Sequence, residues 1–215
     1  MANLELLKLT ISDMAPKIRS GEVSPVELTE AALAQADRLQ PALNSFITIL
    51  RDQAMDQARE QEAALARGEY LGPLQGIPIG IKDNIATGGI RTTVGTKVLS
   101  DNVPEEDAEV VRRCKAAGAI ILGKENLEEF AAGATSNNPH YGPVHNPWAL
   151  DHIPGGPSGG GGANVASGVT CASVGTDLGG SDRKTTRLNS SPKPTSYAAV
   201  CLKKKNTNTT QAYST

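Results

Sequence analysis

The pattern of hydrophobic and polar positions predicts two helices in the N-terminal third of the chain. The segment from Ser24 to Glu27 has the form of a capping box with proline at the first helical position. The Ala-rich run after it predicts a helix toward Leu39, and a second helix is predicted from about Asp52 to Arg67, with Gly68 as its stop. Between them lies a short apolar run at residues 46–50. We assign no chemistry to either helix.

The middle of the chain has the pattern of an α/β protein. Residues 77–81 predict a strand that is irregular because Pro78 cannot donate a backbone hydrogen bond. A helix is predicted from Pro104 to Ala117, with acidic residues in its first turn, and residues 119–122 predict a short buried strand. A strand, a helix and a strand in this order indicate a crossover unit in a sheet covered by helices.

The next segment leads to the most informative motif. Residues 137–162 are rich in Pro, Gly and Asn and predict loops, followed by a short helix near 163–167 and a strand over 169–175. The chain then reaches Gly179, Gly180 and Ser181. Two glycines before a serine let a substrate carbonyl approach the backbone, where successive N–H groups can form an oxyanion hole.

The composition changes abruptly after Ser181. Residues 182–215 contain none of the 22 glycines, and they hold seven of the 21 Lys and Arg residues but one of the 23 acidic residues, which leaves 14 and 22 in residues 1–181. The tail resembles a translated sequencing adapter followed by a translated poly-A stretch. We therefore predict a genuine part, 1–181, and a disordered, non-native tail, 182–215. The alternative is a basic arm that binds nucleic acid.

Composition also narrows the protein class. The chain has no run of 18 apolar residues and no basic, apolar start typical of a secretory signal, so we expect neither a membrane span nor secretion. Its three cysteines, Cys114, Cys171 and Cys201, form no C-x-x-C pair and predict no disulfide framework. We expect a cytoplasmic protein. The acidic balance of residues 1–181 argues against direct binding of nucleic acid.

Other motifs offer weaker chemistry. Lys82 directly follows a predicted strand among apolar neighbours, where a lysine can lose its proton more easily and act as a base. The glycine-rich segment 155–162 lacks the pattern of a phosphate-binding loop. Residues 156–160 match the G-x-S-x-G nucleophile elbow, although residues 151–154 are a poor strand, and a flexible linker is the other alternative. His140, His145 and His152 have no acid or cysteine at metal-ligand spacing, so we expect no metal and no cofactor.

Taken together, five stretches resemble the amidase signature family. They are residues 72–84, 123–130, 146–148, 154–156 and 175–181, and the similarity covers nearly all of residues 5–181 in the right order. The resemblance implies a mixed β-sheet core covered by helices. It also implies hydrolysis of a carboxamide C–N bond through an acyl-serine intermediate, with a Ser-Ser-Lys triad.

The resemblance assigns roles to particular residues. Ser181 would be the nucleophile, Lys82 the ultimate base, and the backbone N–H groups of Leu178, Gly179 and Gly180 would contribute to the oxyanion hole. In the family a bridging serine lies 24 positions before the nucleophile, and here that position is Pro157. The last serine of the same motif is replaced by Gly161. Loss of a positioned proton-transfer group typically costs about 10²–10⁴-fold in rate.

The resemblance leaves several functions open. Members of the family run for several hundred residues, so we expect a fragment that is poorly folded and inactive, the N-terminal portion of an amidase signature domain. Within the family, the rival to a stand-alone amidase is the glutaminase subunit of the tRNA-dependent amidotransferase. A third possibility is a non-catalytic remnant, because of Pro157. The expected partner is a small-molecule amide, with a homodimer or the amidotransferase subunits as protein partners.

Overall fold

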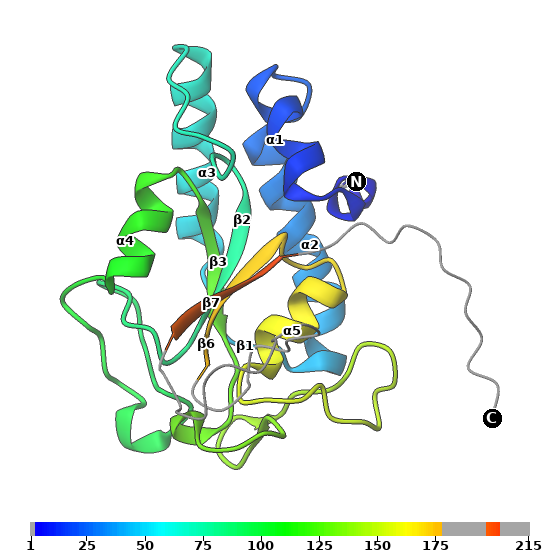
Figure 1. Ribbon diagram of the computed structural model, residues 1–215, viewed down its shortest axis with the longest axis vertical. Helices are drawn as coiled ribbons and strands as arrows, with labels where there is room; N and C mark the ends of the chain where they lie inside the picture. The colour runs from blue at the N-terminus through cyan, green and yellow to red at the C-terminus, as the bar shows by residue number, and fades with distance from the viewer. Residues whose placement is uncertain (1–2, 178–196, 203–215) are drawn as a thin grey trace, which may run out of the picture.

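The computed structural model describes residues 3–177 and 197–202 and has an α/β architecture (Figure 1). Its helices are α1 Ile11–Arg19, α2 Pro25–Leu43, α3 Arg51–Ala66, α4 Glu109–Ala116 and α5 Gly159–Ala166. Its strands are β1 Phe46–Ile49, β2 Pro78–Lys82, β3 Ile120–Glu125, β4 Asn137–Asn138, β5 Gly142–Pro143, β6 Ala172–Asp177 and β7 Tyr197–Leu202. Short 3₁₀ helices lie at Leu4–Lys8, Lys97–Leu99 and Glu129–Ala131.

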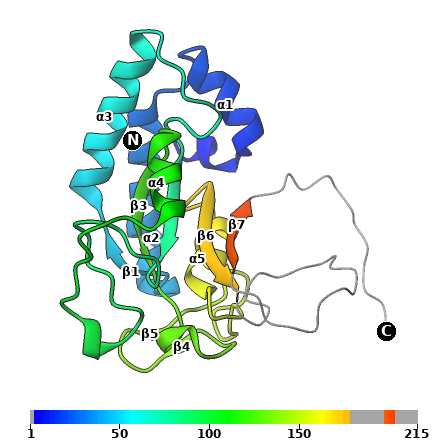
Figure 2. The ribbon, with the colours of Figure 1, turned by 60° about the vertical axis from the view of Figure 1, so that its left-hand side comes forward.

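Five strands form one mixed sheet in the order β1-β3-β2-β6-β7. β2 pairs in parallel with β3 and with β6, whereas β1 and β7 pair in antiparallel fashion at the two edges. The predicted mixed sheet and the crossover from β2 through α4 to β3 are confirmed. Figure 2 shows β4 and β5 at the end of the sheet toward which β2 and β6 run, with α1 at the opposite end.

The interior is built from the apolar faces of β2 and β3 and of the helices that cover them. Burying an isoleucine or leucine side chain completely stabilises a fold by roughly 1.5–3 kcal/mol, so this cluster supplies much of the driving force. Its members include Leu28, Ala31, Ala32, Ile77, Ile79, Ile81, Val111, Ile120, Ile121, Leu122 and Val174. In the described part of the chain, no helix is long and apolar enough to cross a membrane.

Both helices predicted in the N-terminal third are present. The Ser24 hydroxyl caps α2 by accepting hydrogen bonds from the backbone N–H groups of Val26 at 3.0 Å and Glu27 at 3.1 Å. α3 ends where Gly68 adopts a positive φ of 80°, as the sequence predicted. α1 was not predicted from the sequence; Thr10 caps it by accepting a hydrogen bond from the N–H of Asp13 at 3.2 Å.

The helix predicted from Pro104 is shorter than expected, because α4 begins only at Glu109. Residues 104–108 are held against another loop instead. The N–H of Gly89 donates to the Pro104 carbonyl at 2.9 Å, and the N–H of Ala108 donates to the Ala86 carbonyl at 2.9 Å. These two bonds to a distant segment replace the first helical turn.

The glycine-rich segment 155–162 was predicted to be a loop, and this prediction is wrong for its second half. α5 begins at Gly159, because its glycines allow the helix to lie directly on neighbouring backbone. A Cβ at Gly160 would lie 2.4 Å from the Asn126 carbonyl oxygen and 2.5 Å from that of Ser45. The need for close approach therefore outweighs the low helix propensity of glycine.

Part of the tail also differs from the prediction. Tyr197–Leu202 was expected to be disordered, yet it forms β7 and pairs with β6 over six positions. The physical reason is that β6 would otherwise be an edge strand, whose N–H and C=O groups attract any extended segment. The non-native origin of residues 182–215 stays a prediction.

Because α5 packs directly on neighbouring backbone, replacing glycine by alanine should have opposite effects on stability at two of its positions. Gly160→Ala should destabilise the chain by about 1–3 kcal/mol, because the added methyl meets rigid backbone atoms. Gly162→Ala is the matched control, since nothing lies within 4 Å of a Cβ there, and it should stabilise α5 by up to about 1 kcal/mol. Urea unfolding followed by circular dichroism measures both. Equal effects of the two variants would contradict this packing.

Candidate active site

Lys82 is the last residue of β2, and its side chain is 1% exposed. Its Nζ donates to Thr176 Oγ1 at 2.9 Å and lies 3.5 Å from the Thr176 carbonyl oxygen. Thr176 belongs to β6, which pairs in parallel with β2. The lysine predicted as a base therefore lies inside the protein, at the edge where the carboxyl ends of parallel strands meet.

Thr176 connects three segments at this edge. Besides the bond from Lys82, Thr176 Oγ1 accepts a hydrogen bond from Asn84 Nδ2 at 3.0 Å. The Ser158 hydroxyl donates to the Thr176 carbonyl oxygen at 3.3 Å. The strand end of β2, the strand end of β6 and the start of α5 thus converge on one threonine. Neither Thr176 nor Asn84 was predicted from the sequence as a site residue.

The predicted nucleophile and oxyanion-hole residues follow β6 in the chain. Ser181 and the oxyanion-hole residues Leu178, Gly179 and Gly180 lie outside the described residues. Ser181 comes four positions after Asp177, the last residue of β6. The structure therefore brings Lys82 together with the strand that leads to Ser181.

Pro157 occupies the position that the family resemblance assigns to the bridging serine. It follows a cis Gly156–Pro157 peptide bond, it is buried, and its carbonyl accepts from the N–H of Glu128 at 3.3 Å. No strand runs directly into Ser158, because residues 150–158 form turns, bends and irregular backbone, so the alternative of a nucleophile elbow is wrong. The flexible-linker alternative is also wrong, because Gly159 to Gly161 are buried within α5.

Glu125, the last residue of β3, carries a buried carboxyl group that was not predicted from the sequence as a site residue. The Ser173 hydroxyl donates to its Oε2, and Asn164 Nδ2 donates to its Oε1 at 3.1 Å. Burial raises the pKa of Glu125 to about 7, while these hydrogen bonds and the charge of Lys82 oppose the shift. The sequence signal that could have indicated this site is the charged pair Lys124 and Glu125 near the end of the apolar run at residues 119–122.

Lys124, next to Glu125, has a structural role on the other side of β3. Its Nζ donates to the Ile85 carbonyl at 2.6 Å, to Thr87 Oγ1 at 2.8 Å and to Thr92 Oγ1 at 2.9 Å. Burial lowers the pKa of Lys124 to about 8, although Asp83, whose Oδ1 lies 4.0 Å away, partly offsets this. These bonds fix the loop that follows Lys82.

The three histidines predicted to be loop residues lie near the surface with local partners. The contacts are His140 Nε2 to Glu129 Oε1 at 2.8 Å, His145 Nδ1 to the Leu150 carbonyl at 2.7 Å, and His152 Nδ1 to Asp151 Oδ1 at 2.7 Å. Among the residues that the structure describes, no group of three His, Cys, Asp or Glu side chains could hold a metal ion.

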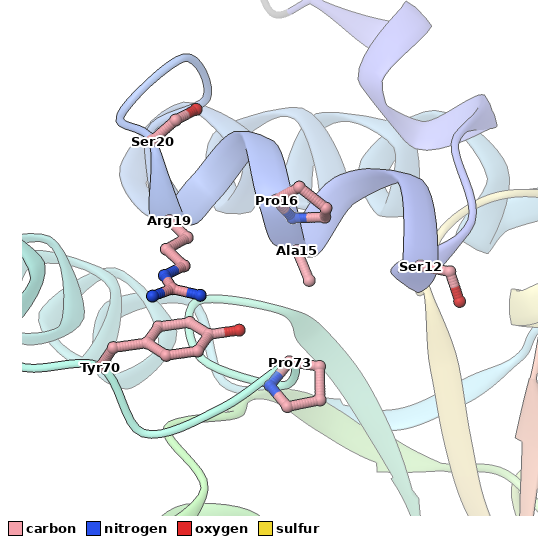
Figure 3. Close-up of a pocket in the computed structure, with 7 residues that line it drawn as sticks. All are labelled: Ser12, Ala15, Pro16, Arg19, Ser20, Tyr70 and Pro73. Atoms are coloured by element: carbon pink, nitrogen blue, oxygen red, sulfur yellow. The ribbon is translucent and has the colours of Figure 1, made fainter.

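A groove of about 500 Å³ lies away from this edge, between α1 and residues 70–73. The Arg19 guanidinium stacks over the Tyr70 ring, 4.8 Å from its centroid, with Pro16 and Pro73 beside it (Figure 3). This cation–π contact ties α1 to the loop before β2. None of the lining residues comes from the carboxyl ends of β2, β3 or β6, so we do not place the active site there.

Known proteins share both the sequence and the fold. The chain is 42% identical over 181 residues to a glutamyl-tRNA(Gln) amidotransferase subunit of Carboxydothermus hydrogenoformans, covering 84% of the chain and 37% of that protein. It is 49% identical over 175 residues to the subunit of the same name from Methylococcus capsulatus, covering 81% and 36%. The chain thus spans little more than a third of the length of these relatives.

Solved structures agree. A peptide amidase from Stenotrophomonas maltophilia matches with a TM-score of 0.77 and 32% identity, covering 83% of the chain and 38% of that protein. A bacterial aryl acylamidase of the amidase signature family matches with a TM-score of 0.78 and 30% identity, covering 81% and 36%. The family model described as Amidase matches residues 27–185, most of the chain. On sequence and fold together, the chain belongs to the amidase family.

Proposed function

We propose that the chain carries the N-terminal part of an amidase that hydrolyses a carboxamide C–N bond through an acyl-serine intermediate. The observation that carries this proposal is the buried Lys82, whose amine lies 2.9 Å from the hydroxyl of Thr176 on the strand that leads to Ser181. A buried amine that can lose its proton is suited to act as a base. Membership of the amidase family supports the same reaction.

In this proposal each residue has one task. Lys82 in its neutral form takes the proton of the Ser181 hydroxyl through an intermediary, and the serine oxygen attacks the amide carbonyl carbon. The backbone N–H groups of Leu178, Gly179 and Gly180 stabilise the resulting oxyanion. The C–N bond then breaks, and the leaving amine takes a proton from the protonated lysine. Water hydrolyses the acyl-serine ester and regenerates Ser181.

Pro157 affects the proton transfer between Ser181 and Lys82, because proline has no hydroxyl that could act as the intermediary. In this chain, Lys82 Nζ is in hydrogen-bond contact with the Thr176 hydroxyl. Its Oγ1 also accepts from Asn84 Nδ2 at 3.0 Å. When Lys82 is neutral, the Thr176 hydroxyl can turn to give its own proton to Nζ and take the proton of Ser181 in exchange. We assign the relay to Thr176 in the present sequence and expect it to be less efficient than a bridging serine at position 157.

A second candidate function is the glutaminase subunit of the tRNA-dependent amidotransferase. The observation that favours it is the identity of 42–49% to subunits of glutamyl-tRNA(Gln) amidotransferase, whereas the solved amidases named above are 30–32% identical. In the first case we expect a small-molecule amide and a homodimer, and in the second the companion subunits. We place the protein in the cytoplasm in either case.

The two candidates are separated by an ammonia-release assay. A stand-alone amidase should release ammonia from simple carboxamides without any partner. The amidotransferase subunit should release it from glutamine only when the companion subunits of the bacterial complex are added. Turnover of simple amides that is unaffected by those subunits would exclude the second candidate.

Restoring a hydroxyl at position 157 tests the relay. Pro157→Ser should raise kcat/KM for a carboxamide by about 10²–10⁴-fold, because it returns a positioned proton-transfer group. Pro157→Ala is the matched control, since it removes the proline ring without adding a hydroxyl. An equal gain in both variants would show that the ring, and not the missing hydroxyl, limits the rate. No gain in either would favour the non-catalytic remnant.

Removing the amine of Lys82 tests the base. In the Pro157→Ser background, Lys82→Met should lower kcat by at least about 10²-fold, because methionine fills a similar volume without a basic group. Lys97→Met, at an exposed lysine, is the control and should leave kcat unchanged. Circular dichroism shows whether each variant is folded. A folded Lys82→Met variant with undiminished turnover would contradict the assignment.

A further inference from the structure

Glu125 lies in a slot built for its carboxyl group. A Cβ added at Gly80 would lie 1.8 Å from Glu125 Oε1, and one added at Gly161 would lie 2.8 Å from Oε2. The side chain therefore crosses β2 at a glycine and meets α5 at another glycine. On the far side, Ser173 of β6 and Asn164 of α5 donate to it. Three segments, β2, β6 and α5, thus enclose the carboxyl that β3 carries.

The slot also explains a departure from the family motif. The resemblance places a serine at position 161, where this chain has glycine. A Cβ there would lie 2.2 Å from Ser173 Oγ as well as 2.8 Å from the carboxyl of Glu125. The Glu125 carboxyl and the Ser173 hydroxyl thus fill the space that a side chain at position 161 would need, and only glycine fits there. The interior is therefore packed specifically around the Glu125 carboxyl.

The slot places the carboxyl beside Lys82. Glu125 and Lys82 are register partners on the parallel strands β3 and β2. Neighbouring strands lie about 4.7–4.9 Å apart, and side chains at paired positions project from the same face. The two groups are both buried, so little water screens one charge from the other.

Few other charges surround the slot in the described residues. α5, from Gly159 to Ala166, contains no titratable side chain, and Ser173 and Gly80 carry none. Lys124 precedes Glu125 and turns to the opposite side, toward Thr87 and Thr92. Asp83 lies beside Lys124, and Asp177 ends β6. Lys82 is thus the cation that shares a sheet face with Glu125.

We propose that Glu125 is a positioning residue for Lys82, whose buried carboxyl determines whether the neighbouring amine keeps its proton. An ionised Glu125 holds the proton on Lys82, whereas a protonated Glu125 leaves the amine free to act as a base. The consequence for catalysis rests on the function proposed above. The coupling between the two side chains does not depend on that function.

The test is a titration of Lys82 by NMR, with the lysine ε-carbons labelled with ¹³C and the resonance assigned through Lys82→Met. Glu125→Gln keeps the shape of the carboxyl and removes its charge, so the pH at which Lys82 titrates should fall by about 1–3 units. The acid limb of the kcat/KM profile should move to lower pH in parallel. Glu109→Gln, at an exposed glutamate, is the control and should change neither the titration of Lys82 nor the acid limb of the kcat/KM profile.

A second variant keeps the test decisive if Glu125→Gln does not fold. Ser173→Ala removes one hydrogen bond to the carboxylate, which disfavours the ionised form of Glu125, and should shift Lys82 in the same direction by a smaller amount. An unchanged titration of Lys82 in the folded variants would overturn the proposal, with or without turnover. A shifted titration in a chain that hydrolyses no amide would support the coupling and show that this chain alone does not carry out the proposed reaction.

Discussion

The structure depends on the burial of ionisable side chains at the ends of two parallel strands. Lys82 ends β2, and Lys124 and Glu125 end β3, and each is at most 1% exposed. Removing an ion from water costs several kcal/mol even in a relaxed protein interior, so each group needs partners or must become neutral. The arrangement of loops and helices around this edge meets that requirement.

Each buried group is compensated in a different way. Lys124 has three oxygen acceptors from the loop after β2, which makes it a structural anchor. Glu125 has two donors and a slot between glycines, and burial favours its neutral form. Lys82 donates to Thr176, on the strand that leads to the predicted nucleophile. This difference separates a lysine that holds the fold from one suited to proton transfer.

Much of the fold could be predicted from the sequence, because its signals are local. The cap at Ser24, the stop at Gly68 and the apolar runs of β2 and β3 depend on neighbouring residues, and the structure agrees with them. α5 could not be predicted in this way. Its glycines indicate a loop, and the reason for them is the backbone on which the helix packs.

The candidate site was predictable only in part. Lys82 and Ser181 stand out through the resemblance to a family, and the structure places the first of them. Thr176 and Glu125 lie beside Lys82 only because their strands pair with β2 or neighbour it in the sheet, although they are 94 and 43 positions away in the chain. No local pattern reveals such contacts. A charged residue at a strand end has the same local signal whether it lies at the surface or in the interior.

The central claim is that the buried amine of Lys82 activates Ser181. Its most direct measurement is the rate at which an alkyl fluorophosphonate labels the chain, followed by intact-protein mass spectrometry. The serine oxygen displaces fluoride, so the account predicts one adduct, at Ser181, that forms much more slowly in the Lys82→Met variant. An adduct at another residue, or a labelling rate that does not depend on Lys82, would contradict the account.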